Sequence, residues 1–464
     1  MAKLDDLNKI IDTNLDKLDM SLKLKVKLRN EVKIKKKFNF KRLGYIGTPM
    51  AAAIIIFVAL ILGPFSANRP LKVNADNLME NIIPQKVKAV ELKKEFLKST
   101  TDFSVELFKH SYKKGQNSLI SPTSVYLALG MTANGADETT LKELETLLGN
   151  GSIGIKDLNS YYNTLTDKLT SVKEGKVSIA NSIWYRDSNN LNVNKDFLQT
   201  NADYYNASAY KADFNDPRTV EDINNWVKNN TGKQIDKMVD KIDKNTMMYL
   251  INAMYFESQW KEPYENFQVR EGTFELINGK KKSVDFMGST EHIYIKDDKT
   301  EGFMKPYKNS KYSFLALLPN KEINIDSYIS SLSGESFQKL LSNQSNEPVS
   351  VALPKFKTNY EIKLADSLKQ MSLKDCFDTE KANFNKMSSN VKKLYISDIL
   401  HKTSIIVAEE GTKASAATKV EIGLGCSTPP IERKITLNRP FVYAIIDNET
   451  KLPIFIGVMM NPEN

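Results

Sequence analysis

Residues 409–418 read Glu-Glu-Gly-Thr-Lys-Ala-Ser-Ala-Ala-Thr (EEGTKASAAT), and an alternating pattern begins within them at Thr412. From Thr412 to Leu424 the even positions are small at first and apolar later, whereas the odd positions are mostly polar. A period of two predicts a β-strand with one buried side. The first buried positions are smaller than the Val, Ile and aromatic residues that strands prefer. The pattern predicts a strand that inserts into a region that is already closely packed. The alternative is an ordinary edge strand or a loop rich in Ala, Ser and Thr.

The composition is that of a globular protein, because 41% of the 464 residues are hydrophobic and 26% are charged. The net charge of +9 is uneven, since residues 1–44 hold thirteen Lys and Arg against six Asp and Glu. The other 420 residues therefore carry only +2. A nearly neutral folded part gives no support for nucleic-acid binding, and we expect none.

A membrane anchor is predicted near the amino terminus. Residues 45–65 contain no charged side chain, which suits a bilayer core about 30 Å thick, and Lys and Arg crowd the preceding segment. The positive-inside rule then predicts a cytoplasmic tail at 1–44 and an extracellular chain after 65. A cleaved signal peptide, and hence a secreted protein, is the alternative, although its charged region would be very long. Residues 66–87 are polar and are expected to form a spacer.

Residues 88–464 are predicted to form one domain, because no repeat, low-complexity tract or linker interrupts them. Cys376 and Cys426 are too few for a disulfide framework. A domain of more than 370 residues can build its own hydrophobic core without one.

Helices are predicted early in this domain and strands late, which indicates an α+β fold. Ser121-Pro122 begins a helix with an N-cap residue and a proline in the first turn. Further helices are expected at 197–205, 220–229 and, as an interruption among the late strands, 364–371. The strands are expected at 177–185, 248–256, 283–287, 302–307, 312–318, 348–352, 395–408, 433–437, 441–447 and 452–459.

Patterns for catalysis or metal binding are missing. His110, His292 and His401 do not have a metal-binding spacing such as HExxH, and no nucleophile elbow or P-loop occurs. The adjacent Glu409 and Glu410 point to opposite faces of a strand, so they are poor partners for acid–base work. His401 lies among apolar residues and is interpreted as a core histidine. We expect no enzyme activity, catalytic residue, metal or cofactor.

Several motifs, in order and with matching spacing, resemble one protein family. These motifs are Asn117–Val125 (NSLISPTSV), Ile223–Val227 (INNWV), Leu250–Phe256 (LINAMYF), Ile435–Tyr443 (ITLNRPFVY) and Ile454–Val458 (IFIGV). The chain resembles the serpins over about residues 88–462, and in particular inhibitory serpins of bacterial type, with an N-terminal membrane anchor added. This resemblance implies helices around a large central mixed or antiparallel sheet, smaller sheets, and an exposed reactive centre loop.

The resemblance also implies a mechanism for residues 409–418. They would be the hinge of the reactive centre loop. The hinge residues would be Glu409, Glu410, Gly411, Thr412, Ala414, Ala416 and Thr418. A target protease would cut the loop, form an acyl-enzyme, and be trapped when the cut loop inserts as a strand into the main sheet. Small buried-side residues suit such insertion. Lys413 departs from the Glu that is common in the family, but it falls on the solvent-facing set.

Two further sites follow from the resemblance. Ser121, Ser124, Asn252 and His401 match the family's polar cluster beneath the point where the sheet opens. The family's usual spacing predicts the scissile bond between Gly425 and Cys426, with bonds at Leu424 and Ser427 as rivals.

The expected partner is a serine protease with a small or apolar specificity pocket, of elastase-like or subtilisin-like type. No Lys or Arg occurs between Val420 and Glu432, so a trypsin-like target is not expected. We expect a monomer that contacts the membrane through 45–65. Inhibition of a cysteine protease, or a non-inhibitory serpin-fold protein that binds a partner at the cell surface, are the alternatives. A membrane enzyme of the hydrolase class is disfavoured, since this sequence contains no nucleophile–base motif.

Overall fold

The computed structural model describes residues 70–171, 174–187, 191–233, 235–388, 390, 394–412 and 433–463. Leu71–Asn464 form one compact unit, and the fold is that of this unit. The predicted tail at 1–44 and the predicted membrane span at 45–65 lie outside the described residues. Within the described ranges, no helix has the length and apolar character needed to cross a membrane.

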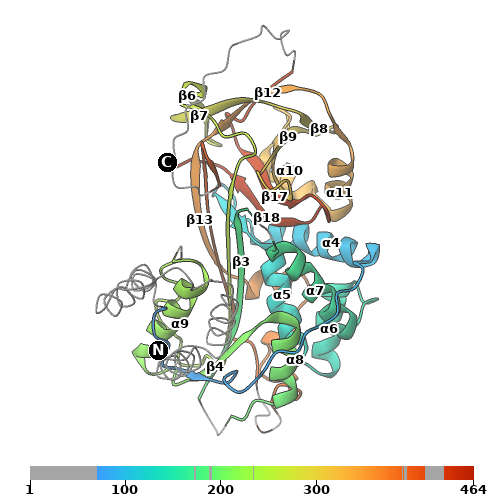
Figure 1. The fold of residues 1–464 in the computed structure, drawn as a ribbon, viewed down its shortest axis with the longest axis vertical. Helices are drawn as coiled ribbons and strands as arrows, with labels where there is room; N and C mark the ends of the chain where they lie inside the picture. Colours follow the sequence, from blue (N-terminus) through green and yellow to red (C-terminus); the bar gives the residue numbers. More distant parts are fainter. Residues whose placement is uncertain are drawn as a thin grey trace, which may run out of the picture. The chain divides into compact units, whose positions relative to one another are not determined.

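The largest sheet in the described part of the chain runs in the order β1-β4-β3-β5-β15-β14-β13. Its strands are β1 (Asp76–Asn77), β3 (Lys176–Arg186), β4 (Ser208–Ala212), β5 (Met248–Gln259), β13 (Phe356–Lys363), β14 (Asp398–Ala408) and β15 (Gly411–Thr412). We call it the main sheet. It is mixed, because β3 pairs antiparallel with β5 and β5 pairs parallel with β14. The long strands β5 and β14 lie at its centre (Figure 1).

Two further sheets, one of seven strands and one of four, complete the β structure of the described residues. One runs β11-β8-β9-β10-β17-β18-β2 and the other β16-β12-β7-β6. The strands of the first are β2 (Ser118–Ile120), β8 (Ile293–Lys296), β9 (Thr300–Pro306), β10 (Tyr312–Pro319), β11 (Gln344–Ser345), β17 (Phe441–Asp447) and β18 (Pro453–Met459). Those of the second are β6 (Val269–Glu275), β7 (Lys281–Glu291), β12 (Val349–Pro354) and β16 (Lys434–Thr436).

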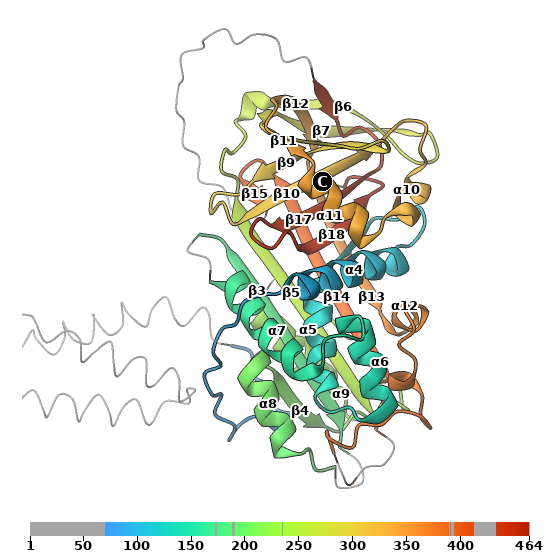
Figure 2. The ribbon, with the colours of Figure 1, turned by 90° about the vertical axis from the view of Figure 1, so that its right-hand side faces the viewer.

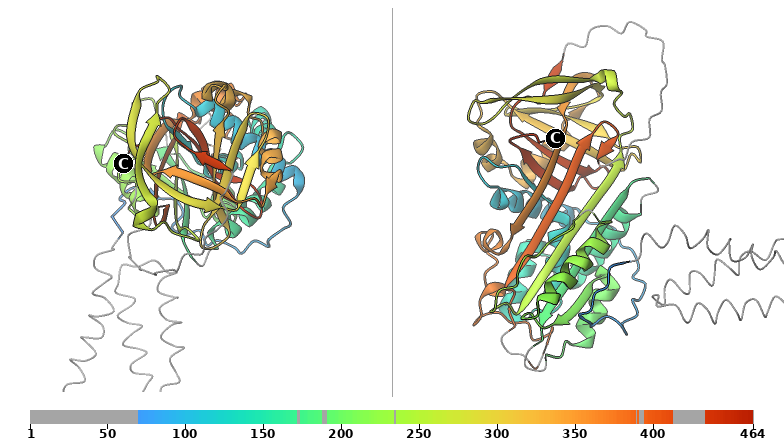
Figure 3. Two further views of the ribbon diagram at one scale, coloured as in Figure 1. Left: turned by 90° about the horizontal axis from the view of Figure 1, so that it is seen from above. Right: turned by 90° about the vertical axis from the view of Figure 1, so that its left-hand side faces the viewer.

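Helices lie on both faces of the main sheet. The helices of the described residues are α4 (Lys94–Ser111), α5 (Pro122–Ala133), α6 (Glu138–Gly149), α7 (Ile155–Thr170), α8 (Lys195–Tyr205), α9 (Pro217–Asn230), α10 (Ile325–Ser331), α11 (Gly334–Ser342), α12 (Ala365–Gln370) and the short 3-10 helices η3 (Asn266–Gln268) and η4 (Asp375–Phe377). Helix α11 contacts α4 and strand β8 of the other seven-stranded sheet. Helices α4 to α8 gather on one face, where α5 contacts both β3 and β5 (Figure 2). Helix α9 covers the opposite face and contacts β3; it is the green helix in the right-hand view of Figure 3.

Helix α5 begins as its sequence predicts. The Ser121 hydroxyl accepts a hydrogen bond from the backbone N–H of Ser124, and Pro122 occupies the first turn. Every residue of α5 is buried, so this helix lies inside the core. Its first turn is therefore held against the centre of the main sheet.

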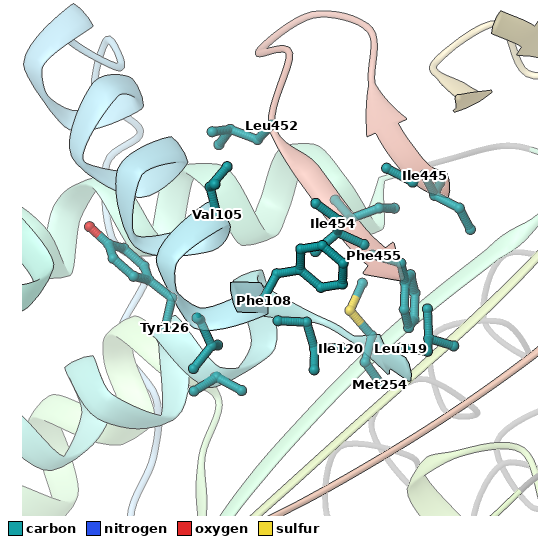
Figure 4. Packing of buried hydrophobic residues seen from close by; sticks show 14 of the residues in the cluster. Val105, Phe108, Leu119, Ile120, Tyr126, Met254, Ile445, Leu452, Ile454 and Phe455 are labelled. Carbon is teal, nitrogen blue, oxygen red and sulfur yellow. The ribbon is translucent and has the colours of Figure 1, made fainter. Parts of the chain in front are cut away.

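The core lies on both sides of the main sheet. Phe108 of α4, Ile120 of β2, Met254 of β5 and Phe455 of β18 are buried together on the side of α4 to α8 (Figure 4). A second cluster under α9 includes Trp184, Trp226 and Tyr249, and it too is buried. A buried side chain of this size contributes about 1.5–3 kcal/mol to folding. Alternate residues of β5 thus face two different cores.

The structure confirms the α+β fold with a large mixed sheet and smaller sheets, and it corrects the expectation of one helix among the late strands. Helices α10 and α11 also lie there, and strand β13 was not predicted. Helix α11 is only 9 residues long, and its start depends on a capping box between Ser333 and Ser336 that is easily read as a turn. In β13, Phe356, Thr358 and Tyr360 alternate as buried residues, a pattern that the sequence does contain.

The compact unit begins earlier than residue 88. Strand β1 pairs with β4 at the edge of the main sheet, and the Leu71 backbone exchanges hydrogen bonds with the Asn229 side chain of α9, each 2.8 Å long. The backbone N–H of Asn74 donates to Asp222 over 2.8 Å. Residues 71–87, which were predicted as a spacer, thus contact the domain.

Candidate functional site

The two central strands of the main sheet part at one end. Near the start of β14, its residues pair directly with β5, from Asp398 opposite Tyr249 to Lys402 opposite Ala253. At the other end, β15 lies between them and pairs antiparallel with both strands. Gly411 and Thr412, which are predicted to be hinge residues, thus lie between β5 and β14. In Figure 2, β15 lies at the end of the main sheet away from β4.

Gly411 is required by the close approach of β15 to β5. Its φ is +153°, and a Cβ atom there would lie 2.2 Å from the carbonyl oxygen of Ser258 and 2.7 Å from the Cα of Gln259. Neither contact can be relieved without moving backbone. A residue with a side chain at this position would push the hinge out of the sheet.

Thr412 is fully buried. Its hydroxyl lies 2.6 Å from the hydroxyl of Tyr307, which follows β9. The Tyr307 ring is stacked on Trp260, with 4.6 Å between ring centroids and 14° between planes, and meets Phe256 edge-on at 5.0 Å. Burial raises the pKa of Tyr307, although the hydrogen bond with Thr412 opposes this rise. The hydroxyl is thus neutral and available as donor or acceptor.

Glu409 and Glu410 form the turn between β14 and β15. Their carbonyl oxygens accept hydrogen bonds from the backbone N–H groups of Tyr264 (3.0 Å) and Trp260 (2.9 Å), respectively. The Glu409 carboxylate lies 2.8 Å from the Lys355 ammonium. Burial raises the pKa of Glu409, but the hydrogen bond with Lys355, a backbone hydrogen bond and the Lys355 charge together outweigh burial, so the pKa is lowered. The turn is therefore held by its backbone and by an ion pair.

The four residues of the predicted polar cluster lie within hydrogen-bond distance of one another. His401 and Asn252 are register partners on β14 and β5. The Ser124 hydroxyl donates to Asn252 Oδ1 over 2.6 Å, and His401 Nδ1 lies 2.6 Å from the same oxygen. The Ser121 backbone N–H donates to His401 Nε2 over 3.0 Å. The cluster joins the start of α5 to the two central strands, just where their direct pairing ends.

The hydrogen bonds define the protonation of His401. Because a backbone N–H can only donate, Nε2 accepts and the proton is on Nδ1, which donates to Asn252. His401 is completely buried, and this burial lowers its pKa to about 3. The cluster is therefore neutral at physiological pH.

Some members of this site were not predicted. The side-chain amide of Asn252 donates to Asn181 of β3 over 2.6 Å, and the Ser121 hydroxyl donates to the Met254 sulfur over 2.7 Å. Asn181 is one of several polar residues of β3, which also contains Ser178 and Ser182, so the sequence offered only a weak signal for it. Tyr307 carried no such signal, since it is separated from Thr412 by 105 residues.

The other predicted positions cannot be located. Ala414, Ala416, Thr418 and the scissile-bond candidates Leu424, Gly425, Cys426 and Ser427 lie outside the described residues. Within the ranges that the structure describes, no group of His, Cys, Asp or Glu side chains is arranged to hold a metal ion. A hollow of about 350 Å³ beside the end of β5 is lined by side chains of both charges, among them Glu174, Lys176 and Lys308.

The described fold is a helix-covered mixed sheet whose central strands, β5 and β14, part around the two-residue strand β15. Residues 98–462 match the family described as Serpin (serine protease inhibitor), and the chain belongs to this family. The family consists, in general, of protease inhibitors.

Curated relatives are similar over most of the chain. Glia-derived nexin of Homo sapiens is 32% identical over 362 residues, which are 75% of this chain and 88% of that protein. An uncharacterized serpin-like protein of Thermococcus kodakarensis is 29% identical over 430 residues, or 89% of this chain and 98% of that protein.

Solved structures support the same fold. The thermophilic serpin tengpin in the native state is 46% identical, with a TM-score of 0.80 over 84% of this chain and 100% of that chain. Tengpin in the latent state is 43% identical, with a TM-score of 0.72 over 81% of this chain and 100% of that chain. The chain thus has the higher similarity to the native-state structure of this pair.

Proposed function

We propose that this protein inhibits a serine protease as a suicide substrate. The observation that carries the proposal is the position of Gly411 and Thr412 between β5 and β14, where these strands part. The hinge occupies the start of a path that continues between the two strands. Membership of a family of protease inhibitors supports the same function.

The chemistry needs only the nucleophile of the target. Its oxygen attacks the carbonyl carbon of the scissile residue and forms an ester, while the peptide C–N bond breaks and the departing amine takes up a proton. The ester keeps the protease attached to the new carboxyl end of the loop. Insertion of the loop would then pull the protease along the main sheet before water can hydrolyse the ester.

The length of the loop fits this movement. Thirteen residues run from Thr412 to Leu424, against 12 in β5 and 11 in β14. At about 3.3 Å per residue, the inserted segment would span about 40 Å, the length of the central strands. A cut at Gly425–Cys426, or at the rival bonds beside Leu424 or Ser427, leaves a segment of this size.

The register of β15 supports the assignment of small hinge residues. Gly411 lies opposite Gln259 and Thr412 opposite Ser258. If this antiparallel register continues, Ala414 meets Phe256 and Ala416 meets Met254, both of which face the core under α4 to α8. Large side chains there leave room only for small partners.

The same register would bring Thr418 opposite Asn252 and His401, since β14 pairs with β15 in a matching antiparallel register. These two residues form one of the five register pairs through which β5 and β14 pair directly. The insertion of a strand has to separate them. We propose that Ser121, Ser124, Asn252 and His401 close the sheet until insertion, and that the Thr418 hydroxyl then joins their hydrogen bonds.

The proposed target has a small or apolar specificity pocket, as elastase-like and subtilisin-like enzymes do, because the segment around Leu424 lacks Lys and Arg. The test is to incubate the fragment 71–464 with proteases of both types and analyse the mixture on denaturing gels. A covalent complex that survives denaturation supports inhibition. Clean cleavage with full recovery of protease activity refutes it and favours a non-inhibitory binding protein; a complex with a cysteine protease instead would redirect the target class.

The anchor is part of the proposal. The uncharged residues 45–65 after a basic tail would hold residues 1–44 in the cytoplasm and the inhibitor outside the cell, while cleavage of this segment would release a secreted form. The bacterial type of the protein remains a prediction. Carbonate extraction of membranes containing the full-length chain tests the anchor, because an integral protein stays in the membrane pellet.

A further inference from the structure

We propose that Tyr307 is a positioning residue that latches the hinge in the sheet before any protease arrives. The hydrogen bond between Tyr307 and Thr412 is 2.6 Å long and completely buried. This inference rests on the proposed function and adds to it a residue outside the loop. It also assigns Thr412 a role beyond small size, since Ala would fit but could not form the bond.

The Tyr307 hydroxyl is held at a defined place. Its ring stacks on Trp260 and meets the edge of Phe256, and the backbones of Trp260 and Tyr307 are joined in a β-bridge. Trp260 in turn donates from its indole N–H to the carbonyl oxygen of Ala408 over 2.8 Å and from its backbone N–H to Glu410. We call the packed rings of Tyr307, Trp260 and Phe256 the aromatic platform. Through Trp260, this platform also holds both ends of the turn before the hinge.

A buried ion pair, Lys305 with Glu291, packs against the aromatic residues around Trp260. The Lys305 ammonium lies 4.3 Å from the centre of the Tyr264 ring and 5.6 Å from that of Trp260. It forms an ion pair of 2.9 Å with Glu291, and both side chains are more than nine-tenths buried. A buried cation on an aromatic face stiffens this arrangement. The hydroxyl of Tyr307 cannot easily follow a hinge that moves away.

The energetic consequence is an all-or-none contact. When Thr412 leaves the sheet, the Tyr307 hydroxyl loses the partner that the described structure gives it and remains buried in an apolar site. A buried hydroxyl without a partner is costly. A docked hinge leaves fewer residues to insert after cleavage, so the latch favours trapping over release of the protease.

The test is a double-mutant cycle in the full-length protein, purified in mild detergent. Tyr307→Phe and Thr412→Val each leave one buried hydroxyl unpaired, whereas the double variant removes both. Hydrogen exchange of the peptide that covers 408–412 is expected to rise about tenfold in each single variant, which corresponds to about 1.4 kcal/mol, and to return close to wild type in the double variant. Thr412→Ser keeps the hydroxyl and should keep the protection.

Tyr312→Phe is the matched control. Tyr312 also packs edge-on against Phe256, at 5.4 Å, and its buried hydroxyl donates to the carbonyl oxygen of Leu169, away from the hinge. This variant should lower thermal stability without changing hinge exchange. Unchanged hinge protection in Tyr307→Phe, or additive losses in the double variant, would overturn the latch.

The functional arm uses the number of inhibitor molecules consumed per protease trapped. It should rise in both single variants, recover in the double variant, and stay unchanged in Tyr312→Phe. If wild type traps no protease, the proposed function fails, and the exchange measurements still decide whether Tyr307 holds the hinge. If wild type traps protease but Tyr307→Phe traps it equally well, the latch has no part in inhibition and the proposal is wrong.

Discussion

At the scale of single residues, Gly411 and Thr412 serve β15 for different physical reasons. Gly411 lacks a side chain where the backbone of β5 leaves no space, and Thr412 brings a hydroxyl to a buried partner. A sequence pattern of small residues does not distinguish these needs. Substitutions at the two positions should therefore fail in different ways.

The first prediction concerns Gly411→Ala. The new Cβ would lie 2.2 Å from the Ser258 carbonyl oxygen, so β15 has to move and inhibition should weaken, with a loss of about 1–3 kcal/mol in unfolding free energy. Urea unfolding and the consumption of inhibitor per trapped protease measure the two effects. Gly279→Ala is the control, because Gly279 also has positive φ, +76°, but has no atom within 4 Å of the added Cβ. Equal effects of the two substitutions would show that backbone strain, and not contact with β5, limits position 411.

The second prediction concerns the pH dependence that His401 imposes. Burial lowers its pKa to about 3 in the folded protein, whereas an unfolded histidine titrates near 6.5. Between these values the unfolded chain binds more protons, so stability falls as pH falls, by about 1.36 kcal/mol per pH unit.

Urea unfolding of wild type and His401→Gln at pH 7 and pH 5 isolates this contribution. The variant should lose less stability than wild type over this interval, since it has no imidazole to protonate. His292→Gln, at an exposed position, controls for the loss of a histidine as such. An identical pH dependence in wild type and His401→Gln would contradict the assignment of a neutral, buried His401.

At the scale of elements, a helix or strand could be predicted where its own residues carry a clear pattern, and could not where it depends on contacts with distant segments. Strands β3, β5, β14 and β17 were predicted from long apolar or alternating runs, and α5 from Ser121 and Pro122. Helices α10 and α11 were missed, because short amphipathic segments between turns depend on tertiary packing. Resemblance grouped His401 with Asn252, and their hydrogen-bond geometry needed the structure. The contact between Tyr307 and Thr412 joins distant segments and leaves no periodic trace.

The third prediction tests the register of the inserting strand. Continued from β15, the register brings Lys413, outside the described residues, opposite Glu257 at the end of β5. Lys413 stands where the family commonly has Glu. Because Lys413 is positive and Glu257 is negative, opposite charges would meet when the strand enters. Glu257→Lys should slow insertion and raise the inhibitor consumed per protease, and Glu257→Lys with Lys413→Glu should restore trapping. A surface pair of this kind contributes about 0.2–1 kcal/mol, so the change should be a few-fold and weaken in high salt.

Failure of the double variant to recover, with both variants folded, would show that the strand enters in another register. Lys261→Glu controls for general charge effects at this end of the sheet, since Lys261 lies two residues after the end of β5 and is exposed.

At the scale of the whole molecule, the main sheet is complete at one end and parted at the other. Direct pairing of β5 with β14 closes the sheet at Asn252 and His401, while β15 holds it open beyond them. A further strand would exchange this one short contact for two full-length ladders. The folded, uncut protein would then have a higher free energy than the form with the inserted strand.

The last prediction follows from this difference. Cleavage within 420–427 should raise the thermal midpoint by about 6 °C or more. An entropy of unfolding of about 2.1 cal/mol/K per residue makes each kcal/mol worth about 1.2 °C in the unit Leu71–Asn464, and insertion should gain at least about 5 kcal/mol. Differential scanning calorimetry of cut and uncut protein measures the shift. Thr412→Arg is the decisive comparison: it should be cut at the same bond, yet a guanidinium buried without a partner costs several kcal/mol and blocks the strand at its first step. The cut variant should therefore keep the midpoint of the uncut one. A midpoint that rises equally in both proteins would mean that stabilisation does not come from insertion between β5 and β14.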